Sequence, residues 1–272
     1  MNALKTKIRQ YPVAASFGVM IACVVFTRIF ALFFSLLPDN VYINIVNEIV
    51  FILWPLAIAV ICGYGWIYKR RGVRKALAAG AASFLPPALL LALAVFSAFF
   101  ADNTQWVPGS EIIFRVLLLF GIGLREETLF RGVVVNLLGE KYLGRKHGLL
   151  ITVGVSGVIF GMLHIFNVFS GVAFSNALFQ ALATSFTGFL YCAIYLRSGS
   201  LWGVALIHST LDAAGLFEAF FLVGGSIDAV FSSIDASALA LGIPQLLLTL
   251  FLLRKSKRGE ILARYQDASA KA

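Results

Sequence analysis

Residues 125–131, which read Arg-Glu-Glu-Thr-Leu-Phe-Arg, place four charges within seven positions of an apolar run from about residue 112 to residue 138. A charged side chain at the centre of a lipid bilayer costs about 2.5–3.5 kcal/mol on insertion scales. Carboxylates can take up and release protons, and arginine can neutralise a carboxylate. Charges retained at such a cost indicate a functional site.

The two neighbouring carboxylates are predicted to have different environments. On an α-helix, Glu127 and Arg131 lie one turn apart on the same face, so we expect an ion pair that fixes the helix. Glu126 points about 100° away from that face and is predicted to lack a partner. Burial disfavours the charged form of a carboxylate, so Glu126 is the candidate for acid–base chemistry near neutral pH.

Two histidines in other apolar runs could complete a site around Glu126. His164 is followed by Asn167 three positions later, and His208 by Asp212 four positions later, so each histidine shares a helix face with a second polar group. We therefore predict that Glu126, His164, His208 and Asp212 converge. The third histidine, His147, lies in a basic loop and is predicted to be solvated.

The composition indicates a membrane protein with several spans. The 272 residues are 60% apolar and 13% charged, whereas a soluble domain is about 45–50% apolar. The net charge of +9 comes from basic residues in short loops, which argues against nucleic-acid binding and for a membrane topology signal. The three cysteines fall in apolar runs without metal-ligand spacing, so neither a disulfide framework nor a zinc-cysteine site is expected.

Eight apolar runs are each about as long as the 17–25 residues that cross a bilayer. We therefore expect an all-α, polytopic bundle that forms a single membrane domain over residues 1–272, with about eight transmembrane helices. The runs cover approximately residues 12–37, 43–67, 76–100, 111–138, 148–169, 174–196, 201–222 and 236–253.

The basic residues predict the orientation of the bundle. With a cytoplasmic N-terminus, the inside segments hold 18 of the 22 Lys and Arg residues, the outside segments hold none, and the other four lie within spans. We expect both termini to be cytoplasmic, with the basic tail 254–272 lying at the inner surface of the plasma membrane. Arg28 and Arg115 lie within spans without an assigned function, and Arg28 is predicted to pair with Glu48.

The polar clusters together resemble the CAAX prenyl protease and bacteriocin-processing family of intramembrane proteases, which includes the type II CAAX endopeptidases. The family pattern is Glu-Glu-x-x-x-Arg, then Phe-x-x-x-His, then His-x-x-x-Asn or Asp. It is matched here by residues 126–131, 160–164 and 208–212, and the resemblance covers roughly residues 110–222. Asp212 stands where the prenyl endopeptidases typically carry Asn.

The resemblance implies an intramembrane endopeptidase that cleaves a membrane-associated peptide, either lipidated or of leader type. Glu126 would be the general base, His164 would hold the water, and His208, together with Asp212, would donate hydrogen bonds to the oxyanion. Four residues are predicted to support these groups: Glu127, Arg131, Asn167 and Phe160.

We expect no cofactor, although zinc is an alternative. Glu126, His164 and His208 match the ligand types of a catalytic zinc site, but the chain lacks a His-Glu-x-x-His motif. The metal-free glutamate mechanism is therefore favoured, in agreement with the resemblance.

Two other classes of function remain open. Glu126 and the histidines could form the proton relay of a transporter, although no inverted repeat is visible. The chain could also be a non-catalytic immunity or scaffold protein. Glycines near the motifs are predicted to let helices separate around a cavity open toward the cytoplasm; they are Gly132, Gly157, Gly161 and Gly188.

Overall fold

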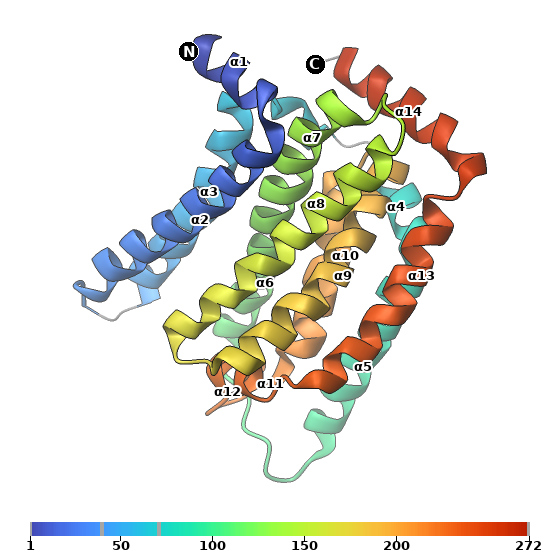
Figure 1. Cartoon of the computed structure of the whole chain (residues 1–272). Coiled ribbons are helices and arrows are strands. Elements are labelled where there is room, and N and C mark those ends of the chain that lie inside the picture. The colour runs from blue at the N-terminus through green and yellow to red at the C-terminus, as the bar shows by residue number, and fades with distance from the viewer. Residues whose placement is uncertain (1, 39–40, 70–71, 271–272) are drawn as a thin grey trace.

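The structure is a computed structural model that describes residues 2–38, 41–69 and 72–270 (Figure 1). Every regular element in these ranges is a helix, and extended backbone pairs there only at an isolated bridge between Trp106 and Leu222. The all-helical prediction is confirmed for this part of the chain. The elements are α1 (Asn2–Gln10), α2 (Pro12–Ser35), α3 (Val41–Ile61), η1 (Gly65–Tyr68), α4 (Val73–Ala79), α5 (Ala81–Phe100), α6 (Gly109–Glu127), η2 (Thr128–Val134), α7 (Val135–Tyr142), α8 (Gly148–Leu163), η3 (His164–Ser170), α9 (Phe174–Ser198), α10 (Leu201–Gly215), α11 (Phe217–Phe221), α12 (Ile227–Ser232), η4 (Ala236–Leu241), α13 (Gly242–Leu252) and α14 (Lys255–Ala270).

Among the described residues, four helical segments are long and apolar enough to cross a membrane: Pro12–Ser35, Ala81–Phe100, Gly148–Ser170 and Phe174–Ser198. A fifth span is possible if the pair Ala236–Leu252 and Lys255–Gln266, which is bent by 74°, counts as one. The chain is therefore a helical membrane protein. The prediction of eight spans with cytoplasmic termini stays a prediction.

Local sequence sets the ends of the helices that carry the site. Pro12 starts α2, where its missing N–H is not needed. Gly171 and Gly199 adopt positive φ values of 90° and 70° and end η3 and α9, as glycine permits. The Ser200 hydroxyl then accepts a hydrogen bond of 3.1 Å from the Gly203 N–H and caps the start of α10.

Glycines bring the central helices together and do not separate them. A Cβ atom on Gly188 of α9 would lie 2.8 Å from the Gly157 Cα of α8, and one on Gly161 would lie 2.3 Å from the Ala181 carbonyl oxygen. A Cβ atom on Gly132 would lie 2.4 Å from the Ile67 side chain. The prediction that these glycines let helices part was therefore wrong, because small residues in membrane bundles allow close backbone approach.

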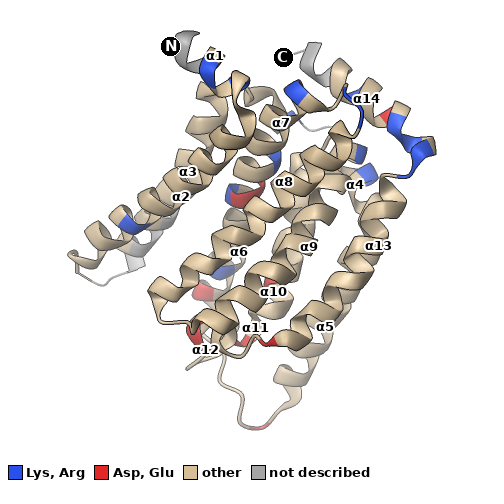
Figure 2. Ribbon diagram, viewed as in Figure 1, with Lys and Arg blue, Asp and Glu red and all other residues tan. Residues whose placement is uncertain are grey.

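The two ends of the bundle carry different charges (Figure 2). Lys and Arg gather around α1, α4 and α14 at the end where both terminal helices lie, whereas Asp and Glu mark the opposite end near α11 and α12. This distribution agrees with the loop count from the sequence. Three of the basic residues counted there lie outside the described residues: Arg70, Arg71 and Lys271.

Candidate active site

The charged motif lies where the α-helix α6 widens into the π-helix η2. Glu126 and Glu127 are the last two residues of α6, and Arg131 lies within η2. Asn136, one turn further on, directs its Nδ2 to the carbonyl oxygens of Arg131 (3.2 Å) and Gly132 (2.7 Å). A π-turn changes the backbone hydrogen-bond pattern, so the buried Asn136 amide supplies partners that the helix itself does not. The sequence predicted one regular α-helix over this run, and it predicted neither the π-turn nor the contacts of Asn136.

The predicted pair between Glu127 and Arg131 is present. The Arg131 Nε lies 3.1 Å from the Glu127 Oε2, and both side chains are 0% exposed. Arg131 also donates from Nη2 to the Gly188 carbonyl at 3.2 Å, and its guanidinium lies 4.5 Å from the centre of the Phe160 ring. These contacts tie η2 to α8 and α9 and offset the cost of burying the two charges.

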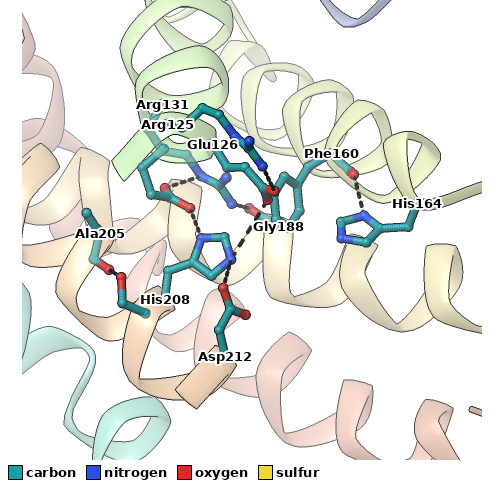
Figure 3. A network of polar contacts seen from close by, with 11 residues as sticks. Arg125, Glu126, Arg131, Phe160, His164, Gly188, Ala205, His208 and Asp212 are labelled. Atoms are coloured by element: carbon teal, nitrogen blue, oxygen red, sulfur yellow. Dashed lines mark hydrogen bonds and ion pairs between the residues drawn. The ribbon is translucent and has the colours of Figure 1, made fainter. Parts of the chain in front are cut away.

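His208 of α10 lies between carboxylates on both sides of its ring (Figure 3). Its Nδ1 is 2.8 Å from the Glu127 Oε1, and its Nε2 is 3.4 Å from the Asp212 Oδ2 and 3.9 Å from the Glu126 Oε2. An ionised carboxylate only accepts hydrogen bonds. A neutral imidazole has one N–H and can donate to a carboxylate on one side only, so a hydrogen bond on both sides of the ring requires one further proton, carried by His208 as imidazolium or by a carboxyl group.

Glu126 differs from the prediction because it has charged neighbours. Its Oε1 lies 3.6 Å from the Arg125 Nη2, and its Oε2 faces His208. Its side chain nevertheless remains 15% exposed, whereas that of Glu127 is 0% exposed. One carboxylate of the motif is therefore enclosed by protein and the other remains accessible, and the chemical role of Glu126 stays a prediction.

His164 begins the 3₁₀ segment η3 at the end of α8. Its Nδ1 lies 3.2 Å from the Phe160 carbonyl oxygen, which only accepts hydrogen bonds, so Nδ1 carries the hydrogen. In the neutral ring, Nε2 is then an acceptor. The threefold repeat of η3 places Asn167 on the same face as His164, and the Asn167 Nδ2 donates to the Gln180 Oε1 of α9 at 2.7 Å. The Phe160 ring makes edge contacts with both His164 and His208.

All four predicted catalytic residues, Glu126, His164, His208 and Asp212, line one cavity of about 460 Å³. The predicted supporting residues Phe160 and Asn167 line it too, whereas Glu127 and Arg131 lie behind it. The sequence did not predict six further polar residues of its wall: Thr27, Arg28, Arg125, Gln180, Thr184 and Thr187. Arg125 could have been found, because it belongs to the charged motif, but nothing in the sequence marked the α9 residues.

The cavity extends toward the end of the bundle that carries α11 and α12. Its lining includes Leu216, Phe220, Val230 and Ile234, and it includes no described residue of α1, α4, α7 or α14. The lining places the cavity toward the end away from the basic loops, and the prediction that it opens toward the cytoplasm stays a prediction. The position of Glu126 along its apolar run could not distinguish the two ends, because Glu126 lies near the middle of that run.

The described residues contain no group of three or more His, Cys, Asp and Glu side chains arranged to hold a metal ion. The ring nitrogens of His208 are already engaged by carboxylates, and the Nδ1 of His164 by a carbonyl. Glu126, His164 and His208 therefore do not form a ligand group of that kind among the described residues. Whether the protein requires a metal stays a prediction.

The two arginines without an assigned function bind backbone carbonyls. Arg28 donates to the Phe166 carbonyl at 3.0 Å and to the Ser170 hydroxyl at 3.3 Å, so it joins α2 to η3. Arg115 donates to the Phe220 carbonyl at 2.8 Å and pairs with Glu111 at the same distance. The side chain of Glu48, the predicted partner of Arg28, lies outside the described residues.

Comparison with known proteins gives a family match for the segment that holds the site. Residues 108–214 match the family described as type II CAAX prenyl endopeptidase Rce1-like. This segment belongs to the Rce1-like family. The match starts at the beginning of α6 and ends at the end of α10, so it contains all three motifs. No curated protein and no solved structure matched the chain.

The family match confirms the resemblance that the three motifs predicted. Rce1-like proteins are a family of proteases, which supports a peptide hydrolase, and a peptide is therefore the substrate that the family implies. The apolar helices place this hydrolase in a lipid bilayer.

Proposed function

We propose that this chain is an intramembrane endopeptidase that hydrolyses a membrane-associated peptide with a water molecule activated by Glu126. The single observation that carries the proposal is that Glu126, His164, His208 and Asp212, from three separate helical segments, line one cavity. Polar groups are costly in lipid, so their convergence on an accessible hollow favours chemistry over structure alone.

Glu126 and His164 are the groups suited to hold the attacking water. The Glu126 carboxylate accepts hydrogen bonds, and so does the Nε2 of neutral His164, because its Nδ1 hydrogen is directed to Phe160. A water that donates to both has its oxygen lone pairs free to attack a peptide carbonyl carbon. Glu126 takes the proton as the new C–O bond forms, and the peptide carbonyl oxygen becomes the oxyanion.

The His208 cluster is suited to the oxyanion and to the leaving amine. In the imidazolium form, the Nε2–H of His208 faces the region between Glu126 and Asp212 and can donate to an oxyanion there. The scissile C–N bond breaks when the amine nitrogen receives a proton, which Glu126 returns after taking it from the water. The products are a carboxylic acid and an amine, and no covalent enzyme intermediate is required.

The wall of the cavity suits an extended peptide. Its lining presents amide and hydroxyl groups from Asn167, Gln180 and Thr184, together with apolar side chains such as Leu211 and Val230. Amides and hydroxyls can satisfy main-chain groups of a substrate that leaves water, and the apolar surface can hold its side chains. Both a lipidated peptide and a leader peptide meet these requirements.

Glu126→Gln tests the proposal, because it keeps the shape of the side chain and removes the base. We expect cleavage of a membrane-anchored reporter peptide by the purified protein to fall by about 10²- to 10⁴-fold. His164→Ala should act in the same direction, while Glu111→Gln, at the outer end of the same helix, should leave the rate unchanged. Undiminished cleavage by Glu126→Gln would refute the mechanism.

Chelation tests the metal question separately. We expect purified protein to keep full activity after exhaustive treatment with a zinc chelator, with no zinc found by elemental analysis. Loss of activity that zinc restores would replace the glutamate mechanism with a metal-dependent one, although the peptidase assignment would remain.

A further inference from the structure

We infer that a second, smaller pocket binds the phosphate group of an anionic phospholipid. This pocket lies between the loop that joins α7 to α8, the first turn of α8 and the first half of α14. It shares no lining residue with the cavity beside Glu126. The inference therefore does not depend on the proposed peptidase function.

The charged side chains that line the pocket are basic. Arg145 and His147 come from the loop, Arg258 comes from α14, and no Asp or Glu lines the pocket. Among the described residues, neither arginine takes part in an ion pair. Glu260, two positions after Arg258, is already paired with three other basic side chains. The pocket thus gathers positive charge that the protein itself does not neutralise.

The start of α8 adds hydrogen-bond donors to the same pocket. Ile151 donates to the His147 carbonyl at 3.0 Å, whereas the N–H groups of Leu149 and Leu150 make no hydrogen bond within the part of the chain that the structure describes. Both residues line the pocket. Guanidinium groups match the oxygens of phosphate in geometry and charge, and a helix N-terminus also favours an anion. These donors come from two segments that are more than 100 residues apart in the sequence.

The size of the pocket limits what it can hold. Its volume is about 90 Å³. Pockets for drug-sized ligands have volumes of about 300–1,000 Å³, so a nucleotide or a peptide does not fit inside. A single phosphate group is small enough, either free or as the head of a larger molecule that extends out of the pocket.

The position of the pocket favours a lipid over free phosphate. Gly148 lines the pocket and is the first residue of the candidate membrane span Gly148–Ser170, so the pocket lies where this span enters the headgroup region. Along α8 from that point, Leu150, Ile151 and Val158 are 47%, 37% and 43% exposed. Acyl chains can pack on these side chains while the phosphate occupies the pocket, at the end of the bundle where the basic residues gather (Figure 2).

A phosphate in this pocket would join α14 to the rest of the bundle. It would contact Arg145 in the loop and Arg258 in α14 at the same time. The Tyr265 hydroxyl already holds α14 by donating to the Asn136 carbonyl at 3.1 Å. Bound lipid should therefore slow amide hydrogen exchange in α14, an effect that loose adsorption of lipid to exposed basic residues does not produce.

The test uses the full-length protein in a maltoside detergent, whose headgroup is neutral. Three probes are titrated: dioctanoyl phosphatidylglycerol, dioctanoyl phosphatidylcholine, which has the same chains but no net charge, and inorganic phosphate, which has no chains. Native mass spectrometry measures binding, and hydrogen exchange measures the protection of α14. We expect phosphatidylglycerol to bind at least about tenfold more tightly than either other probe and to be the one that protects α14.

Matched variants distinguish a site from general attraction between charges. Arg145→Gln and Arg258→Gln should each weaken binding of phosphatidylglycerol about tenfold or more, because each removes a charged hydrogen-bond donor of the pocket. Lys146→Gln and Lys255→Gln remove the same charge from the same two segments, but neither lysine lines the pocket, so binding should stay within about twofold of the parent. If Arg258→Gln loosens α14 without lipid, Arg145→Gln in the loop remains the test.

Three results would overturn the inference. Equal binding of phosphatidylglycerol and phosphatidylcholine would show that the negative charge is not recognised. Protection of α14 by inorganic phosphate at the same concentrations as by phosphatidylglycerol would assign the pocket to a soluble anion and not to a lipid. Equal weakening by the arginine and lysine variants would show adsorption to the basic surface without a defined site.

Discussion

Polar side chains on the two sides of Glu126 differ in how far they are buried. On the packed side, Glu127, Arg131 and Asn136 are fully buried, and each makes at least one contact to a neighbouring polar group. On the cavity side, the side chains of Glu126 and Asp212 remain 15% and 23% exposed. His208 joins the two sides, with Nδ1 on the packed side and Nε2 on the cavity side. The comparison shows that two adjacent carboxylates on one helix can have different exposure, one enclosed by protein and one facing a cavity.

The largest effect that tests this contrast is expected from Arg131→Met. The change leaves Glu127 as a buried, uncompensated charge, and breaking a buried pair in this way costs about 3–5 kcal/mol. The matched change Arg125→Met removes a partly exposed arginine that is 3.6 Å from Glu126, and it should cost less than about 1 kcal/mol. Thermal unfolding in detergent measures both. Equal destabilisation by the two variants would contradict the division into a packed side and an accessible side.

A smaller effect is expected from Asn136→Leu, which keeps the approximate shape of the side chain and removes its donors. The Arg131 and Gly132 carbonyls would lose their side-chain partner, at a cost of about 1–3 kcal/mol. Those carbonyls hold the π-turn behind Glu126. The cleavage rate, measured at temperatures at which the variant is still folded, should therefore also decrease, with a larger change in kcat than in KM.

Tyr195→Phe is the control for Asn136. It removes a hydroxyl that lies 3.3 Å from the Asn136 Nδ2 but leaves both carbonyl contacts in place, so it should have little effect on cleavage. If Asn136→Leu lowered only the unfolding temperature and left kcat unchanged, Asn136 would stabilise the fold without positioning the motif.

The sequence predicted the parts of this contrast that depend on charge and spacing. Glu127 and Arg131 are one turn apart, and an uncompensated charge in an apolar run demands a partner, so their pairing could be inferred without coordinates. The convergence of His164 and His208 with Glu126 could be inferred because each is an expensive polar group in a separate span. The family match to residues 108–214 agrees with that inference.

The features that were missed depend on packing and on helix geometry. The π-turn at Thr128–Val134 has no signature in an apolar run, and it changes which atoms lie behind Glu126. Gly157 and Gly188 were expected to separate helices, yet they allow α8 and α9 to pack closely. This contact depends on the relative positions of both helices, which the sequence of either helix alone does not give. The position of the cavity along the bundle depends on how η1 and α7 fill the packed end, and no local pattern encodes that.

The smallest effect is expected at the outer surface of the packed side, where α14 rests on the bundle. The Arg197 Nη1 donates to the Glu260 Oε2 at 2.8 Å, Arg264 donates to the Glu260 Oε1 at 2.9 Å, and the Tyr265 hydroxyl donates to the Asn136 carbonyl at 3.1 Å. Glu260 lies in the charged helix α14, beyond the bend after α13, and the hydrogen bond from Arg197 lowers the pKa of its carboxyl to about 2. A lowered pKa in the folded state stabilises the docked helix at neutral pH, and this contribution is lost as the pH falls from about 4.3 toward 2.

Glu260→Gln should therefore speed hydrogen exchange in α14 at pH 7. After correction for intrinsic pH effects, the exchange rate of the variant should not change between pH 5 and 3, and it should be about equal to the rate of the parent protein in acid. Peptide cleavage should stay within about twofold of the parent, because the exposed ion pairs of Glu260 contribute little and lie at the end with the basic residues, away from the cavity. A large loss of cleavage without unfolding would mean that the docked tail controls the site through Asn136. The packed side would then regulate catalysis and not only support it.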